Sequence, residues 1–139
     1  MRLCNDTITV FNARVDQDVG GNVWTPTVIA GVSWFMTDAS TVDASRGGLV
    51  AANKAVIRIP EGADAGGKAY ADPVSYRNAE SVSRLWTLQQ GDVIVKGSVS
   101  EGTWTPAALK KAYAECVTVL GVTDNRRAPK GAHWRVTAT

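Results

Sequence analysis

The most regular feature of the chain is an alternation of apolar and polar residues, the pattern of a half-buried β-strand. Ala55, Ile57 and Ile59 fall on one face of such a segment. Lys54 and Arg58 fall on the other face. Alternation of this kind is typical of an antiparallel sheet with one face on a core and one face in solvent.

Similar segments, rich in β-branched residues and separated by turn residues, recur along the sequence. We expect strands at residues 7–15, 27–36, 50–60, 93–99, 117–122 and 133–138. The first changes its apolar phase between Val10 and Phe11, which predicts either a bulge or burial on both faces. In the second, the pattern predicts that one face carries Val28, Ala30, Val32, Trp34 and Met36.

Two segments lack a strand pattern, and we interpret them as long loops. Residues 37–48 are small, polar and glycine-containing. Residues 61–90 begin with an open glycine turn, and the Asp72-Pro73 step within them predicts a short helix. Trp86 is expected to fasten the far end of this second segment to the core.

One clear helix is predicted in the C-terminal half. Thr105 supplies a hydroxyl cap, and Pro106 occupies the first helical position. We expect this helix to continue to Glu115, with one apolar stripe made of Leu109, Ala112, Tyr113 and Cys116. The sequence therefore predicts a mainly β domain over residues 1–139, a small β-barrel or sandwich of about six strands with long loops and one short helix.

Composition and charge mainly exclude classes of protein. The 139 residues, of which 45% are hydrophobic and 20% charged, suit one ordinary globular domain. A net charge of +2 argues against a dedicated nucleic-acid binder. The chain starts without an apolar segment of signal-peptide length and has no run long enough to span a bilayer. We therefore expect a soluble protein that is made in the cytoplasm and has no membrane partner.

The reactive side chains predict neither a catalytic nor a metal site. The one histidine, His133, lies in an alternating strand, and the acidic residues form no close pair for acid–base chemistry. Cys4 and Cys116 lack the ligand spacing of a zinc site. No glycine cluster matches a phosphate-binding loop. We expect no enzymatic activity and no cofactor.

Two groups of residues are candidates for a protein interface. Arg126, Arg127 and Lys130 form the densest basic cluster, which is either a solvated turn or a contact for phosphate or for an acidic partner. Trp24 and Trp104 each precede a Thr-Pro step at the edge of an element. They are candidate interface anchors, since tryptophan is enriched in such roles, and core packing is the alternative.

Five stretches carry a resemblance to a known group of proteins. The ordered series "DTITVFNA", "TVIAGVSW", "GLVAANKAVIRIP", "LQQGDVIVKGSV" and "LGVTDNRRAPKGAHWRV" resembles a family of small tailed-bacteriophage structural proteins of unassigned function. A looser likeness extends to head–tail joining proteins, also called head closure or stopper proteins. Its elements are the opening Thr7-Ile8-Thr9 strand, Trp34, the apolar strand to Ile59 and the Gly91-Asp92 strand.

This resemblance implies a ring-forming neck component that joins portal or adaptor proteins to tail proteins in the virion, with transient contact to packaged DNA. The alternatives are tail completion, tail termination or a minor capsid role, because the chain adds a helix and a strand pair beyond the Gly-Asp strand. The two long loops are then candidates for channel or inter-subunit contacts, through Arg46, Lys68, Tyr70, Tyr76 and Arg77. A small oligonucleotide-binding barrel and an enzyme are the remaining function classes.

Overall fold

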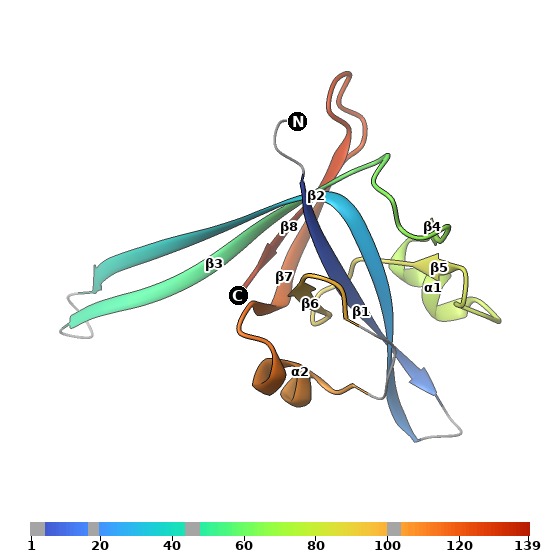
Figure 1. Ribbon diagram of the computed structural model, residues 1–139, viewed down its shortest axis with the longest axis horizontal. Coiled ribbons are helices and arrows are strands. Elements are labelled where there is room, and N and C mark those ends of the chain that lie inside the picture. The colour runs from blue at the N-terminus through green and yellow to red at the C-terminus, as the bar shows by residue number, and fades with distance from the viewer. Residues whose placement is uncertain (1–4, 17–19, 44–47, 100–103) are drawn as a thin grey trace.

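Six antiparallel strands close into a barrel in this computed structural model, which describes residues 5–16, 20–43, 48–99 and 104–139 (Figure 1). The order around the barrel is β1-β2-β3-β8-β7-β6. These strands are β1 (Asp6–Asp16), β2 (Gly21–Asp43), β3 (Gly48–Pro60), β6 (Val93–Lys96), β7 (Cys116–Asn125) and β8 (His133–Ala138). The predicted fold class is confirmed, and between barrel and sandwich the structure is a barrel.

The barrel interior is filled by the apolar faces of all six strands. Buried and solvent-facing residues alternate along β3 and β8 as the sequence predicts. On β3, the buried residues are Ala55, Ile57 and Ile59. Val136 and Trp134 on β8 pair with this face in an antiparallel register. Alternation therefore identified the core face of these two strands correctly.

A second apolar cluster lies outside the barrel, against β1 and β6. Phe11 of β1 belongs to this cluster, whereas its neighbour Val10 belongs to the barrel core. The cluster consists of Phe11, Val93, Val95, Val99 and Leu109. Burial on both faces of β1 thus explains the phase change seen in its sequence. Leu109 comes from α2 (Pro106–Ala112), which Thr105 caps as predicted and which ends before Glu115.

The predicted apolar face of β2 is wrong in part, because a bulge shifts its phase. Thr7 of β1 pairs with Ala30 and Asp6 pairs with Val32, so Gly31 is the extra residue. Its φ of 82° lies in the left-handed region, which glycine adopts without strain. Val28, before the bulge, is consequently exposed while Ile29 is buried.

The segment predicted as a loop at residues 37–48 is mostly a β-hairpin arm. β2 and β3 pair continuously from Ser33↔Arg58 to Asp43↔Gly48, and Figure 1 shows them leaving the barrel together. We call residues 35–43 and 48–53 the arm. Small and polar residues suggested a loop because they lack a core-facing pattern, but strands outside a core need none.

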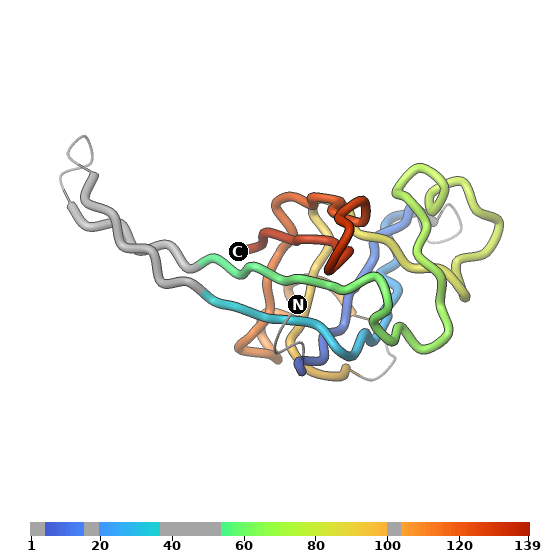
Figure 2. The backbone as a smooth tube through the Cα atoms, turned by 90° about the horizontal axis from the view of Figure 1, so that it is seen from above, coloured from blue at the N-terminus to red at the C-terminus, as the bar shows by residue number. Residues whose placement is uncertain are grey.

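The connection at residues 61–90 folds back over one end of the barrel, opposite the end where β2 and β3 leave it (Figure 2). Asp72 caps α1 (Pro73–Asn78) by accepting from the Ser75 backbone N–H at 2.9 Å, as the Asp-Pro step predicted. The short strands β4 (Ala69–Tyr70) and β5 (Leu85–Trp86) pair in parallel. Trp86 is buried in the barrel core, so it fastens this segment as expected.

Candidate functional site

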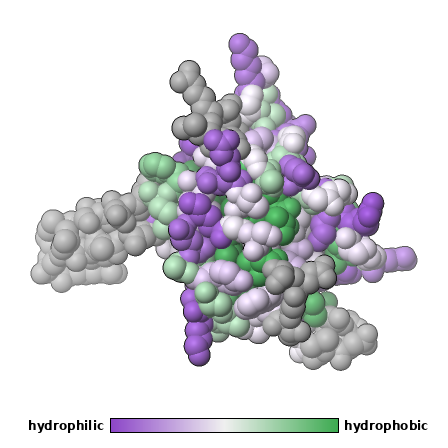
Figure 3. Space-filling view, viewed as in Figure 1, coloured by the Kyte–Doolittle hydropathy of each residue, from purple (hydrophilic) through white to green (hydrophobic). Residues whose placement is uncertain are grey.

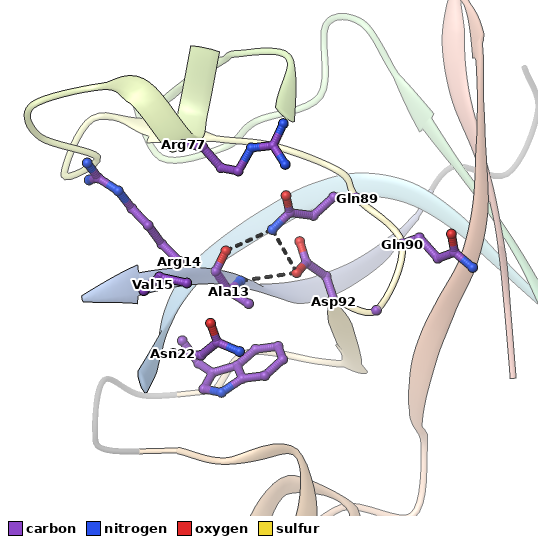
Figure 4. A pocket seen from close by; sticks show the side chains of 10 residues that line it. Ala13, Arg14, Val15, Asn22, Arg77, Gln89, Gln90 and Asp92 are labelled. Carbon is purple, nitrogen blue, oxygen red and sulfur yellow. Dashed lines mark hydrogen bonds between the residues drawn. The ribbon is translucent and has the colours of Figure 1, made fainter. Parts of the chain in front are cut away.

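A depression of about 310 Å³ opens where β1, β2, α1 and the turn before β6 meet (Figure 4). Its lining includes Arg14, Asn22, Trp24, Arg77, Gln89 and Asp92. Arg14 donates a hydrogen bond to the Ala79 carbonyl oxygen, beyond the end of α1. Figure 4 shows Arg77 reaching from α1 toward Gln89, while Arg14 extends to the other side. The two guanidinium groups therefore do not converge on one point.

Asp92 forms the inner wall of this depression and is only 1% exposed. Its Oδ2 accepts a hydrogen bond from Asn12 Nδ2 at 2.7 Å. Its Oδ1 accepts from the Ala13 backbone N–H and from Gln89 Nε2, both at 3.1 Å. Burial raises the pKa of Asp92 to about 6, against the opposing effect of these three donors.

Asn12 extends the same network to the segment before β6. Its Nδ2 donates to the Thr87 carbonyl oxygen at 2.7 Å, and its Oδ1 accepts from the Thr87 backbone N–H at 3.1 Å. The network therefore closes the barrel end by tying β1 to residues 87–92. Both carboxylate oxygens of Asp92 accept hydrogen bonds in this network, which anchors the segment before β6 to β1.

The basic turn between β7 and β8 holds Arg126 in one position. Its Nε and Nη2 bind the Asp124 carboxylate, with Nη2 to Oδ2 at 2.8 Å. Its guanidinium also lies 5.0 Å from the Tyr70 ring centre and 4.9 Å from that of Trp134. The hydrogen bond from Arg126 holds the pKa of Asp124 below its usual value. Arg127 and Lys130 on the same turn are exposed.

Tyr70, Trp86 and Trp134 form the aromatic cluster beneath Arg126. The ring centres of Tyr70 and Trp134 are 4.6 Å apart, and those of Trp86 and Trp134 are 5.2 Å apart. Burial raises the pKa of the Tyr70 phenol. The structure thus joins a residue predicted for a loop contact, Tyr70, with one predicted for an interface, Arg126. Sequence reasoning missed the pairing because only the barrel topology brings the two segments together.

The other predicted interface tryptophans are both half-buried against the second apolar cluster. Trp24 and Trp104 both pack on it, and the Trp104 ring centre is 5.8 Å from that of Tyr113. Part of each indole therefore contributes to packing within the chain, which was the alternative considered for them.

The residues predicted for channel or inter-subunit contacts lie in different environments. Tyr76 is fully buried, so its prediction as a channel or inter-subunit contact is wrong, because the short helix α1 turns its ring inward. Lys68 Nζ donates to the Pro26 carbonyl oxygen at 2.9 Å and to Thr27 Oγ1 at 3.0 Å. Arg77 is exposed at the rim of the Asp92 depression. Arg46 lies outside the described residues.

His133 contacts a backbone carbonyl and an amide side chain in the described part of the chain. Its Nδ1 lies 2.6 Å from the Gly131 carbonyl oxygen, and its Nε2 lies 3.4 Å from Asn125 Nδ2. No group of three or more His, Cys, Asp or Glu side chains that is suited to a metal ion occurs among the residues described. Within the same residues, no helix has the length and apolar character that crossing a membrane requires.

The arm presents the longest free strand edges in the described structure. β1 pairs with β2 only up to Val32, and β8 pairs with β3 only from Ala55. Within the residues described, no third strand pairs with the arm. Apolar side chains stand exposed where the arm leaves the barrel, with Phe35 at 57% and Met36 at 43%. Leu120, the extra residue of a second bulge in β7, is 44% exposed.

Polar and apolar residues are mixed over the rest of the surface. In the view of Figure 3, hydrophilic side chains stand around the edge of the body, and apolar residues gather near its middle, over β6.

Comparison with protein families gives a match over nearly the whole chain. Residues 3–139 match DUF6751, described as a family of unknown function. No curated protein and no solved structure matches the chain.

Proposed function

We propose that this chain, which belongs to DUF6751, a family of unknown function, is a phage structural protein that forms a ring at the head–tail junction. It acts in this role through protein contacts, as a head closure or stopper subunit between portal or adaptor proteins and the tail.

The observation that carries this proposal is the arm. A closed barrel removes strand edges, since each strand has a partner on both sides. The arm differs from the barrel in this respect, because it carries β2 and β3 beyond their barrel partners. Among the described residues, the two strands pair only with each other there, out to Asp43↔Gly48. Its free backbone N–H and C=O groups favour strand addition with another chain.

Apolar residues at the root of the arm support the same contact. Phe35 and its cross-strand neighbour Val56 pair directly on the two strands. More than half of the Phe35 side chain is exposed. Such exposure is uncommon for phenylalanine and favours a partner that covers the ring. Backbone pairing along the arm and burial of this side chain would stabilise one interface together.

A second copy of the chain is the occupant that suits an arm at one end of the barrel. An arm that contacts a different surface of the next copy makes a heterologous interface, and such interfaces close into rings when the rotation permits. The ends of the molecule differ as this requires, since the connection at residues 61–90 covers the end opposite the arm (Figures 1 and 2).

The position at the head–tail junction is supported by the sequence resemblance rather than by the arm. The strand order from Thr7 to the Gly91-Asp92 turn resembles that of head–tail joining proteins. A net charge of +2 on 139 residues also suits a ring that passes DNA without binding it tightly.

A genetic test separates this position from other virion roles. Deletion of the gene from a phage that encodes this chain is expected to yield DNA-filled heads and separate tails, which electron microscopy of the lysate resolves. Complementation by the full chain is expected to restore joined particles, and a chain with residues 37–52 replaced by a short Gly-Asn turn is expected not to.

An Arg84→Gln chain serves as the control, because Arg84 is exposed and lies outside the arm, and it is expected to complement fully. Joined, infectious particles from the deletion phage would refute the proposal. Tails of abnormal length would instead assign the chain to tail completion.

A further inference from the structure

The turn between β7 and β8 concentrates the positive charge of the chain. The turn carries three cations, Arg126, Arg127 and Lys130, and one carboxylate, Asp124, so its own residues have an excess charge of +2. This excess equals the net charge of the whole chain. The Glu61 carboxylate, on the connection after β3, is also near enough to act on Arg126. A depression of about 510 Å³ lies at this turn and is lined by Asp124, Arg126 and Arg127.

Arg126 is held in place before any ligand arrives. Contacts with the Tyr70 and Trp134 rings fix the plane of its guanidinium, and Asp124 fixes its Nε and Nη2 edge. A fixed arginine loses little side-chain entropy on binding, and stacked arginines are common among the residues that dominate protein interfaces. The position is therefore that of a preformed binding group.

Guanidinium N–H donors at this turn remain available for a ligand, beside those that bind Asp124. Within the described residues, Arg126 Nη1 makes no hydrogen bond, and Arg127 makes neither a hydrogen bond nor an ion pair. Arg127 lines the depression beside Arg126 and is close enough to Asp124 to lower the pKa of that carboxyl. The depression thus offers two neighbouring guanidinium groups, of which only that of Arg126 is hydrogen-bonded to a carboxylate among the described residues.

We propose that this depression binds a carboxylate of a neighbouring protein, in an acidic peptide segment. Guanidinium groups match the planar geometry of a carboxylate and bind it through paired hydrogen bonds. Nucleic acid fits less well, because affinity for its backbone grows with the number of phosphates contacted, and the turn has few cations and one lining carboxylate. The biological partner rests on the proposed function, whereas the binding chemistry does not.

Titration of the isolated, ¹⁵N-labelled chain tests this site. The probes are Ac-Gly-Asp-Gly-Asp-Gly-NH₂, its asparagine counterpart, inorganic phosphate and a single-stranded oligothymidine, each at the same ionic strength. The aspartate peptide is expected to shift the amide signals of Arg126 and Arg127 and the indole signal of Trp134 in a saturable way. The asparagine peptide is expected to leave them unchanged.

Two variants locate the binding group. Arg127→Gln is expected to weaken binding of the aspartate peptide about tenfold, because it removes charge-assisted hydrogen bonds. Arg126→Lys keeps the charge, but it is expected to weaken binding as well, because it removes Nη1 and the contacts with Asp124, Tyr70 and Trp134 that hold the group in place. Arg84→Gln, which removes the same charge elsewhere, is expected to change the affinity less than about twofold.

The other outcomes overturn the proposal. Tighter binding of phosphate or oligothymidine than of the aspartate peptide would reject the ligand class. Absence of saturable shifts, or equal losses in Arg127→Gln and Arg84→Gln, would reject the site. Since no virion is involved, these results are independent of the chain's position in a particle.

Discussion

Asn12 and Asp92, on segments that are distant in the sequence, are joined by a 2.7 Å hydrogen bond from Asn12 Nδ2 to Asp92 Oδ2. Both side chains are buried, and no cation balances Asp92 among the donors that surround it. A buried carboxylate without a counter-ion costs free energy, which hydrogen bonds offset only in part. This pair therefore makes the stability of the closed barrel depend on pH.

Stability is expected to rise as the pH falls from 7 toward 4. The pKa of Asp92 is about 6 in the folded chain, above its ordinary value of 3.8, so the folded state binds the proton more tightly than the unfolded state. The stabilisation is complete below the unfolded pKa and is lost as the pH rises through about 6. The shift corresponds to about 3 kcal/mol in the free energy of unfolding.

Urea denaturation of the wild type and of Asp92→Asn over this pH range measures the effect. The variant is expected to lack this component, so the difference between the two chains should change with pH. The exposed Asp72 and Asp124, whose pKa values are lowered, act in the opposite direction in both chains alike. A difference that does not vary with pH would contradict the assignment to Asp92.

Loss of the Asn12 side chain is expected to cost about 3 kcal/mol of unfolding free energy. Asn12→Ala leaves the Thr87 backbone groups and one Asp92 oxygen without their donor or acceptor, in a buried place. Asn22→Ala, at an exposed position on the rim of the same depression, is the matched control and is expected to cost less than about 0.5 kcal/mol. Equal costs would show that Asn12 is not an anchor.

The bulge in β2 makes Gly31 sensitive to substitution. Gly31→Ala places a side chain at a φ of 82° and is expected to destabilise the fold by about 1–2 kcal/mol. Gly62→Ala is the control, because a Cβ there meets nothing within 4 Å and its φ is not in the left-handed region. Thermal unfolding of the two variants compares them, and an unchanged Gly31→Ala midpoint would argue against the bulge.

Gly31 also shows where the sequence pattern is insufficient. The pattern of β3 and β8 could be followed directly, because each strand keeps one register against its partners. In β2 one additional residue reverses the faces, so Val28, before the bulge, is exposed although the sequence pattern places it on the face of Val32 and Trp34. Met36 keeps that face but is exposed because it lies where the arm leaves the barrel. A glycine within a strand pattern is the local signal of such a bulge, but it does not specify on which side the phase changes.

The contacts of the Asn12–Asp92 pair and of Arg126 were also unpredictable from the sequence, but for another reason. Asn12 and Asp92, like Tyr70 and Arg126, meet only because the barrel closes and the connection at residues 61–90 folds over its end. The residue types were visible in the sequence, and Arg126 was selected for its charge. Its partners were not visible, because they depend on topology rather than on spacing.

Removal of the arm is expected to abolish self-assembly but to leave the barrel folded. The described core residues nearest to the arm are Trp34 and Ala55, and both remain when residues 37–52 are replaced by a short Gly-Asn turn. The thermal midpoint of this variant should lie within a few degrees of the wild type. Native mass spectrometry should then find rings for the wild type and for Arg84→Gln, and monomers for the variant. Rings formed by the variant would exclude the arm as the assembly element.

The position of the chain in an intact particle tests the central claim most directly. Cryo-electron microscopy of virions from a phage that encodes this chain is expected to show copies of the six-stranded barrel as a ring between portal and tail, with each arm against the next copy. Density for the chain in the capsid or along the tail, or none in the particle, would contradict the assignment to the head–tail junction.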